Sequence, residues 1–294
     1  MAKQQAAGLP LVQTREAAKR ISRSRRDFSE VVRHLFILIP LVLTFFPFIM
    51  ALQISFKSFP QLLNNFWLPS WPLHLENYVW AFQEIYRFML NSAFVSVISL
   101  TGMLLFSSLA AYAFARIDFV LHDAFYYAVI AMLMIPGVLT LIGRFLLIAR
   151  LGLMNSLWGL ILPYISGGLA FAVFLMTAFF KELPEEMFES ARMDGATNLD
   201  MYWYLALPLS KPIMFTVGLL SFLGIWGDYI WPLLVLKDRS KFTLMMGLAT
   251  FSGANAVEYG PLMAGYVLAS IPTAIIIILM MRTFSGAALT GAFK

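Results

Sequence analysis

Long apolar runs, separated by shorter polar stretches, make up most of this 294-residue chain. A helix that crosses a bilayer needs roughly 20 mostly apolar residues in succession. Six runs are long enough, at residues 35–55, 89–115, 124–142, 156–180, 212–236 and 261–281. The pattern therefore predicts an all-α membrane protein with six transmembrane helices. Asp228, in the fifth run, is the one charged residue within these runs.

Lysine and arginine are distributed unevenly between the polar segments. The segment before the first run, residues 1–34, holds eight Lys or Arg and three Asp or Glu. Because basic residues beside the first span favour the cytoplasm, this tail is predicted to be cytoplasmic. With alternate segments inside, the inner side carries fourteen basic residues and the outer side seven, which places both termini in the cytoplasm. Nucleic-acid binding is the less favoured interpretation of the basic tail, and we expect no nucleic-acid partner.

A polar island interrupts the apolar pattern between the fourth and fifth runs, at residues 181–211. Pro184 followed by two glutamates is typical of a helix start, because the acids lie near the positive end of the helix dipole. Gly195 suits the left-handed residue that ends many helices, and Thr197 with Asp200 is typical of the start of another. The pattern predicts a helix, a glycine turn and a second helix outside the bilayer. This unit is either a docking element for a soluble partner or an amphipathic connector at the membrane interface.

Composition agrees with a membrane protein. Hydrophobic residues make up 60% of the chain, charged residues 13%, and the mean hydropathy is +0.78, whereas a soluble domain carries about a quarter charged residues. Cysteine is absent, so disulfides and thiolate metal sites are excluded. His34, His74 and His122 lack metal-ligand spacing, and the chain has no phosphate-binding G-x-x-x-x-G-K-[ST] loop and no G-x-S-x-G elbow. We therefore expect no catalytic residue, metal or cofactor in this chain.

Aromatic residues flank the charge in the fifth run: Trp226, Tyr229 and Trp231 lie beside Asp228. Aromatic rings stack on the apolar faces of sugars while a carboxylate accepts hydroxyl hydrogens, so these four residues are candidate substrate contacts. The same residues are also typical of the aromatic belt at a membrane surface, and both interpretations remain open. A secondary transporter is the rival class, because such proteins place ionisable residues at membrane depth. In this chain only Asp228 fits that description.

The motif in the polar island resembles the EAA loop of permeases from binding-protein-dependent ABC importers. It runs Glu189-Ser190-Ala191-x-x-Asp194-Gly195-Ala196, with Leu207-Pro208 following. The usual motif begins Glu-Ala-Ala, so Ser190 is a departure. Further stretches resemble the maltose-type carbohydrate permeases, among them SSLAAYAFARIDF (107–119), LGLMNSLWGLILPY (151–164) and WGDYIWPLL (226–234). The resemblance covers nearly all of residues 35–294 and indicates the six-span member of a heterodimeric permease pair.

The resemblance implies a type I ABC importer permease fold over residues 35–294. It also implies a bacterial or archaeal plasma membrane, which is the inner membrane in a Gram-negative cell. The island would be the loop that couples to a cytoplasmic ATPase, through Glu189, Ser190, Ala191, Asp194, Gly195, Ala196 and Pro208. The implied partners are a homologous permease, two ABC subunits that bind ATP and Mg²⁺, an extracytoplasmic binding protein and membrane lipid. The substrate would be a sugar or an oligosaccharide.

Two features leave the substrate and its delivery open. Arg144 follows the third run, where the family tends to be apolar. An arginine near a polar cavity can pair with a carboxylate, so an acidic oligosaccharide is one hypothesis, and snorkelling of Arg144 to lipid headgroups is the other. Glycerol phosphate is a further polar substrate for such a permease. The outer segment 237–260 resembles the family's loop that reaches the binding protein, and the alternative is a plain connector between spans.

Overall fold

The structure is a computed structural model that describes residues 10–254 and 258–291. Helices account for most of this part of the chain, and it contains no β-strand, as the hydrophobic pattern predicted. The long helices are α1 (Pro10–Ser55), α3 (Glu76–Arg116), α6 (Trp158–Glu182), α10 (Lys211–Trp226) and α13 (Tyr259–Gly291). Shorter helices link them: α2 (Phe59–Asn64), α4 (His122–Ala131), α5 (Leu141–Arg150), α7 (Glu185–Met193), α8 (Asn198–Met201), α9 (Leu207–Leu209), α11 (Ile230–Val235) and α12 (Leu244–Ala254).

Four helical stretches are long and apolar enough to cross a membrane, at residues 33–55, 76–116, 158–182 and 259–279. A fifth is added if the bent pair formed by residues 198–209 and 211–226, which meet at 71°, is counted as one span. The described part of the chain therefore supplies four or five spans by length and composition. The count of six stays a prediction.

Two of the predicted spans are broken helices. The third, residues 124–142, is interrupted between α4 and α5. Pro136 explains this break, because proline lacks an N–H group and its ring disfavours helical backbone at the preceding residue, and Ile135 is indeed extended (φ −85°, ψ 112°). The fifth, residues 212–236, is interrupted between α10 and α11 around Asp228. Apolarity alone predicted the length of these runs but not their interruptions.

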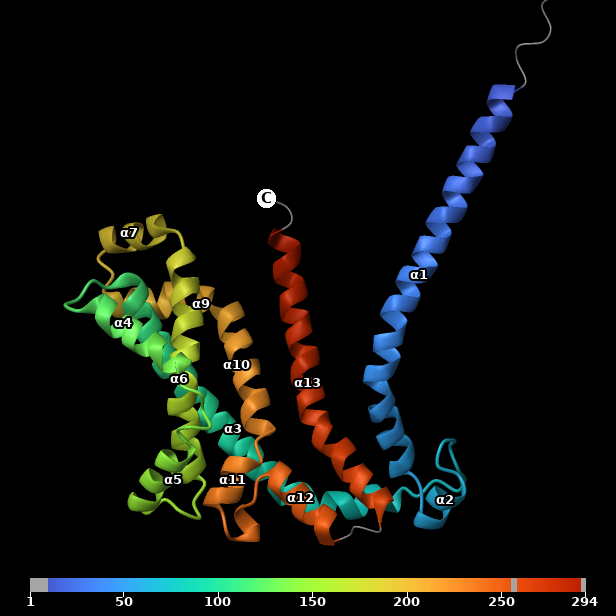
Figure 1. The fold of residues 1–294 in the computed structure, drawn as a ribbon. Coiled ribbons are helices and arrows are strands. Elements are labelled where there is room, and N and C mark those ends of the chain that lie inside the picture. Colours follow the sequence, from blue (N-terminus) through green and yellow to red (C-terminus); the bar gives the residue numbers. More distant parts are fainter. Residues whose placement is uncertain (1–9, 255–257, 292–294) are drawn as a thin grey trace, which may run out of the picture.

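The crossing of α3 and α6 forms the centre of the bundle (Figure 1). Small residues allow this close approach: a Cβ at Gly168 on α6 would overlap the sulfur of Met103 on α3, and Ala111 and Ala172 are fully buried. Contact through small residues is the usual basis of helix packing in membranes. From this crossing, one buried cluster extends toward each end of α6.

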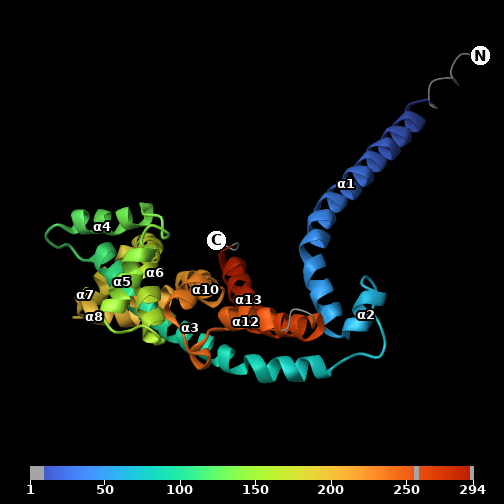
Figure 2. The same ribbon diagram turned by 60° about the horizontal axis from the view of Figure 1, so that its bottom comes forward.

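Helix α1 stands apart from the other long helices. It contacts α13 but leans away from the rest of the bundle (Figures 1 and 2). Its side chains between Leu35 and Ile49 are exposed all round, and a helix that is apolar on every side needs a non-aqueous surrounding. Helix α1 also runs without interruption from Pro10. The backbone of residues 10–34, predicted as part of a separate tail, is therefore continuous with the first span.

The two ends of the bundle carry different elements. Helix α7 lies at one end, together with the first turns of α1 and the last turns of α13 (Figure 1). Helices α2, α5, α11 and α12 lie at the other end (Figure 1). We call the end with α7 the inner end and the opposite end the outer end. The polar island, the start of α1 and the end of α13 lie at the inner end (Figure 1). That this end and both termini lie in the cytoplasm stays a prediction.

Candidate functional sites

The polar island folds into two helices joined by a glycine turn. Helix α7 starts after Pro184, with Glu185 and Glu186 in its first turn. It is closed by Gly195, whose φ is +86° and whose amide donates to the Arg192 carbonyl over 3.0 Å. A left-handed residue of this kind favours glycine, because a Cβ would crowd the neighbouring backbone. The helix, turn and helix that the sequence predicted are all present.

Phe188 anchors α7 to the bundle. Its side chain is fully buried, in an inner cluster that includes Tyr112, Phe180 and Tyr202. Arg116, the last residue of α3, covers the ring, with its guanidinium carbon 4.2 Å from the ring centroid. Apolar burial and the attraction between a cation and an aromatic face therefore both hold α7 in place.

Arg116 also fastens three elements by hydrogen bonds. Its Nη2 donates to the carbonyls of Phe180 (2.7 Å) and Leu183 (2.5 Å), and its Nη1 pairs with the Glu185 carboxylate. Glu185 in turn accepts a hydrogen bond of 3.1 Å from Arg192. The end of α3, the end of α6 and the start of α7 thus meet at one point. A displacement of α7 would be transmitted through these contacts to two long helices.

Helix α8 is capped and tied to α3. The Thr197 amide donates to Asp200 Oδ2 over 2.9 Å, and the Asp200 amide donates to Thr197 Oγ1 over 3.2 Å, which is a capping box. The hydrogen bonds from the Thr197 hydroxyl and amide hold the pKa of Asp200 below its usual value. Tyr202, in the π-helical turn that follows, shares a hydrogen bond of 2.7 Å with Ser108 on α3. Both halves of the island are therefore fixed to the bundle.

The motif residues divide between the bundle and the surface. Ala191 and Ala196 are half-buried. The other five are exposed: Glu189, Ser190, Asp194, Gly195 and Pro208. Beside them, Met193, Leu199 and Tyr204 keep 88%, 64% and 78% of their surface exposed. The surface of α7 and α8 thus combines carboxylates with large apolar side chains, and exposed apolar groups rimmed by polar ones are typical of a protein-binding site.

Asp228 caps the short helix α11. Its Oδ1 accepts hydrogen bonds from the amides of Ile230 (2.9 Å) and Trp231 (3.3 Å), and its Oδ2 accepts one of 2.9 Å from the Tyr164 hydroxyl. The carboxylate satisfies amides that would otherwise lack partners at the start of a helix. It also links the break in the fifth apolar run to α6. In this structure Asp228 positions α11.

The residues predicted to contact a sugar do not form one accessible platform. Trp226 and Trp231 are 5% and 2% exposed, and their indole N–H groups donate to the carbonyls of Ala269 (3.4 Å) and Gly159 (3.2 Å). A sugar cannot stack on rings that are already packed, so both tryptophans are core residues here. Tyr229, which is 39% exposed, is the one aromatic residue of the three that stays accessible.

Arg144 lies on the inward face of α5 and is half-buried. Its guanidinium carbon is 5.1 Å from the centroid of the Trp231 ring, and its Nε is enclosed without a hydrogen-bond partner. No carboxylate within the described residues forms an ion pair with it. A half-buried cation without an ion-pair partner is costly in an apolar environment. Arg144 is therefore a candidate contact for an anion.

Asn155 is a structural residue that the sequence analysis did not single out. It adopts the left-handed conformation (φ 57°), which asparagine tolerates better than most residues. Its Oδ1 accepts hydrogen bonds of 3.1 Å from the amides of Lys237 and Asp238, and its Nδ2 donates to the Asp238 carboxylate over 2.6 Å. Asn155 therefore connects the start of α6 to the outer segment after α11. In the sequence, the Asn155-Ser156 pair between two apolar runs is a turn signal, and this signal could have indicated the role of Asn155.

The first part of the outer segment, residues 237–254, is attached to α3. Asn91 on α3 donates hydrogen bonds of 2.9 Å to two of its carbonyls. The segment then continues as α12, which packs on α3 and begins with the fully buried Leu244. Residues 255–257, part of the stretch expected to reach a binding protein, lie outside the described residues.

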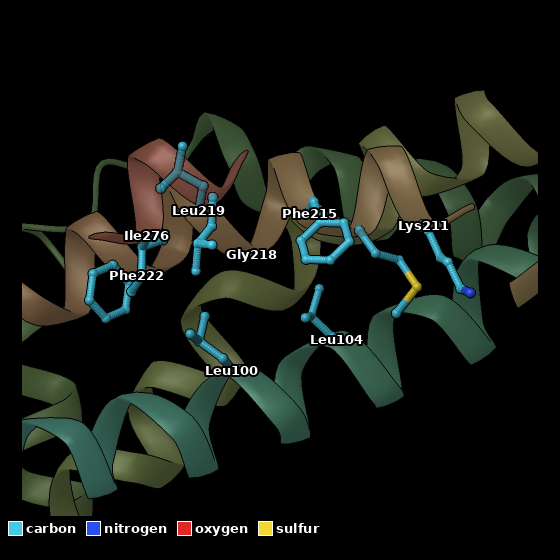
Figure 3. Close-up of a pocket in the computed structure, with 10 residues that line it drawn as sticks. Leu100, Leu104, Lys211, Phe215, Gly218, Leu219, Phe222 and Ile276 are labelled. Atoms are coloured by element: carbon cyan, nitrogen blue, oxygen red, sulfur yellow. The ribbon is translucent and has the colours of Figure 1, made fainter. Parts of the chain in front are cut away.

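An apolar groove of about 630 Å³ runs between α3, α10 and α13 (Figure 3). Lys211, at the start of α10, is the one ionisable side chain among the described residues that line it. Leu100, Phe222 and Ile276 line this groove and also a second hollow of about 380 Å³ beside it. A lining this apolar suits the side chains of another helix better than the hydroxyl groups of a sugar.

Comparison with known proteins places these features in a family. A family model described as "Binding-protein-dependent transport system inner membrane component" matches residues 16–287. A diacetylchitobiose uptake system permease protein of Streptomyces coelicolor is 30% identical over 283 residues, which are 94% of this chain and 93% of that protein. An arabinooligosaccharides transport system permease protein of Halalkalibacterium halodurans is 32% identical over 256 residues, which are 85% of this chain and 91% of that protein.

The fold is also similar to that of a solved transporter. A chain of a bacterial ABC transporter involved in the import of the acidic polysaccharide alginate superposes with a TM-score of 0.79, over 89% of this chain and 98% of that one. The two are 24% identical in sequence, so this likeness concerns the fold. The family match covers more than half of the chain, and the fold agrees with it. The chain belongs to the family of binding-protein-dependent transport system inner membrane components.

Proposed function

We propose that this chain is a permease subunit of an ATP-driven importer that carries a sugar or an oligosaccharide. Membership of the family makes it a multi-pass plasma membrane protein and a transport subunit rather than an enzyme. Carbohydrate as the substrate class is supported by two relatives, which are permeases of uptake systems for diacetylchitobiose and for arabinooligosaccharides. The substrate itself is delivered by a separate binding protein.

The fixed position of α7 is the main observation in support of coupling between this chain and ATP hydrolysis. Phe188 and Arg116 hold this exposed helix at the inner end, where a soluble subunit can reach it. The chain has no phosphate-binding loop of its own. Two separate ABC subunits therefore bind ATP and Mg²⁺, and they contact the loop through Glu189, Ser190, Ala191, Asp194, Gly195, Ala196 and Pro208.

A homologous permease completes the pathway. The apolar surface of α1 and the groove between α3, α10 and α13 support a second membrane subunit, because the described residues of this chain leave both surfaces largely exposed. Apolar helices associate in membranes through close packing rather than through exclusion of water. The groove is shaped for such packing.

Stimulation of ATPase activity by sugars tests this function. The assembled importer is reconstituted with its binding protein, and hydrolysis is measured across a panel of mono- and oligosaccharides of defined length. We expect stimulation by carbohydrates that the binding protein holds, and no hydrolysis by the purified chain alone. Hydrolysis by the chain alone, or stimulation by a panel of amino acids and not by any sugar, would contradict the proposal.

An acidic oligosaccharide is a second candidate substrate, because the Nε of Arg144 is enclosed without a hydrogen-bond partner and no carboxylate among the described residues forms an ion pair with this arginine. A guanidinium can bind a sugar carboxylate through two parallel hydrogen bonds. We expect Arg144→Gln to reduce uptake of a uronate oligosaccharide more than uptake of a neutral oligosaccharide of the same length. Arg150→Gln is the matched control, since Arg150 lies on the same helix but is exposed. Equal losses for both sugars would leave Arg144 as a residue that positions Trp231 or reaches lipid headgroups.

A further inference from the structure

The segment between α1 and α3 carries an uncharged aromatic surface. Residues 58–75, which we call the outer aromatic loop, contain no Asp, Glu, Lys or Arg. Trp67, Leu68 and Trp71 keep 66%, 65% and 80% of their surface exposed. The outer segment 237–260 differs in charge, because it begins with four closely spaced charged residues: Lys237, Asp238, Arg239 and Lys241. The charged outer segment 237–260 therefore suits an aqueous surrounding, whereas the exposed aromatic side chains of the outer aromatic loop do not.

The outer aromatic loop folds back along the first span instead of projecting away from it. The ring centroids of Trp67 and Phe46 are 6.4 Å apart, and Gln53 Nε2 donates to the Phe66 carbonyl over 3.0 Å. Phe46 precedes the end of α1 at Ser55 by about 13 Å at the rise of an α-helix. Figures 1 and 2 show the chain after α2 rising beside the outer part of α1. Trp67 therefore lies against the exposed apolar surface of a membrane-spanning helix.

Side chains within and beside the loop satisfy the backbone carbonyls of Asn65, Phe66 and Pro72. Lys57 is 1% exposed, and its Nζ donates to the carbonyls of Asn65 (2.6 Å) and Phe66 (3.1 Å). Gln61 Nε2 donates to the Pro72 carbonyl over 3.0 Å. A loop surrounded by water has no need of an enclosed ammonium group for this purpose. Irregular backbone that contacts lipid does need it, because lipid offers no hydrogen-bond partners.

We propose that the outer aromatic loop inserts into the outer leaflet of the membrane, at the boundary between phospholipid headgroups and acyl chains. Tryptophan favours this boundary, since its ring is apolar and its N–H group can still reach a polar partner. The exposed side chains of the loop continue the apolar surface of α1 through the contact between Trp67 and Phe46. A phospholipid surface fits this combination better than a water-soluble protein, whose binding site would carry a polar rim.

The insertion anchors the end of the first span beside a fixed point of the bundle. Asn77 on α3 donates hydrogen bonds to the carbonyls of Ser55 (2.9 Å) and Lys57 (3.1 Å). The loop is thus attached both to the bilayer surface and to α3. It sets the depth of the outer ends of α1 and α3 in the membrane, whatever substrate the importer carries.

Single cysteines test the insertion directly, because the natural chain has none. Leu68→Cys and Trp71→Cys leave the Trp67–Phe46 contact intact, and Lys237→Cys is the matched control on the charged outer segment. Each variant is labelled with a small fluorophore in the assembled importer in phospholipid nanodiscs. Fluorescence is quenched either by phospholipids that carry a nitroxide near the headgroup or by iodide in the buffer. Size-exclusion chromatography checks assembly of each labelled variant.

We expect the labels at positions 68 and 71 to be quenched by the nitroxide lipids and protected from iodide, with the reverse pattern at position 237. Quenching by iodide at 68 and 71, as strong as at 237, would place the loop in water and overturn the proposal. Protection from both quenchers would also overturn it, because that result would mean that a protein partner covers the loop.

Discussion

Gly195 is the residue on which the geometry of the polar island, residues 181–211 and the proposed coupling loop, depends most. Its φ of +86° is unfavourable for any residue with a Cβ, while the space around a Cβ there is empty. The cost of substitution is therefore one of backbone conformation, about 1 kcal/mol for alanine and more for a β-branched residue. Packing does not contribute to it.

Gly195→Val should consequently redirect α8 relative to α7 and uncouple the importer. We expect the Gly195→Val permease to insert into the membrane but to transport little. Gly195→Ala should have a transport activity between those of Gly195→Val and the wild type. Transport and retention of the ATPase subunits are measured together for the three proteins. Normal transport by Gly195→Val would show that α7 and α8 do not need this turn.

Asp200 gives the loop a dependence on pH. Its folded-state pKa is lowered by the hydrogen bonds from Thr197, so it stabilises the capping box at pH values above the usual aspartate pKa of about 3.9. This stabilisation is lost as the pH falls through the folded-state value. Amide exchange in residues 197–201, measured relative to the intrinsic exchange rate, should therefore lose protection as the pH falls below about 3.9 and through the folded-state pKa, while its protection at higher pH stays constant. Asp200→Asn should remove this acid-dependent loss of protection, and an unchanged pH dependence in that variant would contradict this assignment.

At the scale of elements, α7 is held by one aromatic side chain more than by its own helix propensity. Phe188→Ala removes a fully buried ring, a change that costs about 3–5 kcal/mol in a packed site. We expect α7 to detach locally, with faster amide exchange over residues 185–193 and loss of the ATPase subunits. Met187→Ala is the control, because Met187 is 38% exposed. Equal effects of the two substitutions would argue against Phe188 as the anchor.

The sequence predicted those elements whose signals are local. The turn at Gly195 and the capping box of Thr197 and Asp200 were predictable because their partners lie within a few residues. The contact of Arg116 with Phe188 was not, since these residues are far apart in the chain and nothing in either neighbourhood indicates the other. Pro136 explains the break in the third apolar run, but the apolar residues on both sides of it concealed that break in the sequence.

The aromatic residues of the fifth run show a different limit. Trp226 and Trp231 were candidates for sugar contact or for a membrane belt, and the structure buries both. Buried and surface tryptophans have similar apolar neighbours in the sequence, so only their contacts in the structure distinguish the two. Asp228 was expected to line a substrate pathway. Its hydrogen bonds show that it caps α11 and links that helix to Tyr164.

At the scale of the whole molecule, the single chain is an incomplete structure. Its first helix is apolar and exposed all round between Leu35 and Ile49, and an apolar groove lies open between α3, α10 and α13. The coupling loop and the outer aromatic loop lie at opposite ends (Figure 1). These surfaces fit a subunit that is enclosed by lipid and by a second permease and is reached from the inner end by ATPase subunits.

Uptake by the reconstituted importer tests the central claim, that α7 couples ATP hydrolysis to passage of a sugar. Proteoliposomes hold ATP and Mg²⁺ inside, and the binding protein with a labelled oligosaccharide is supplied outside. We predict accumulation of the sugar that requires internal ATP, persists when ionophores abolish proton and sodium gradients, and is lost in Phe188→Ala. Accumulation that follows an ion gradient without ATP would contradict the account, since it would make the protein a secondary transporter.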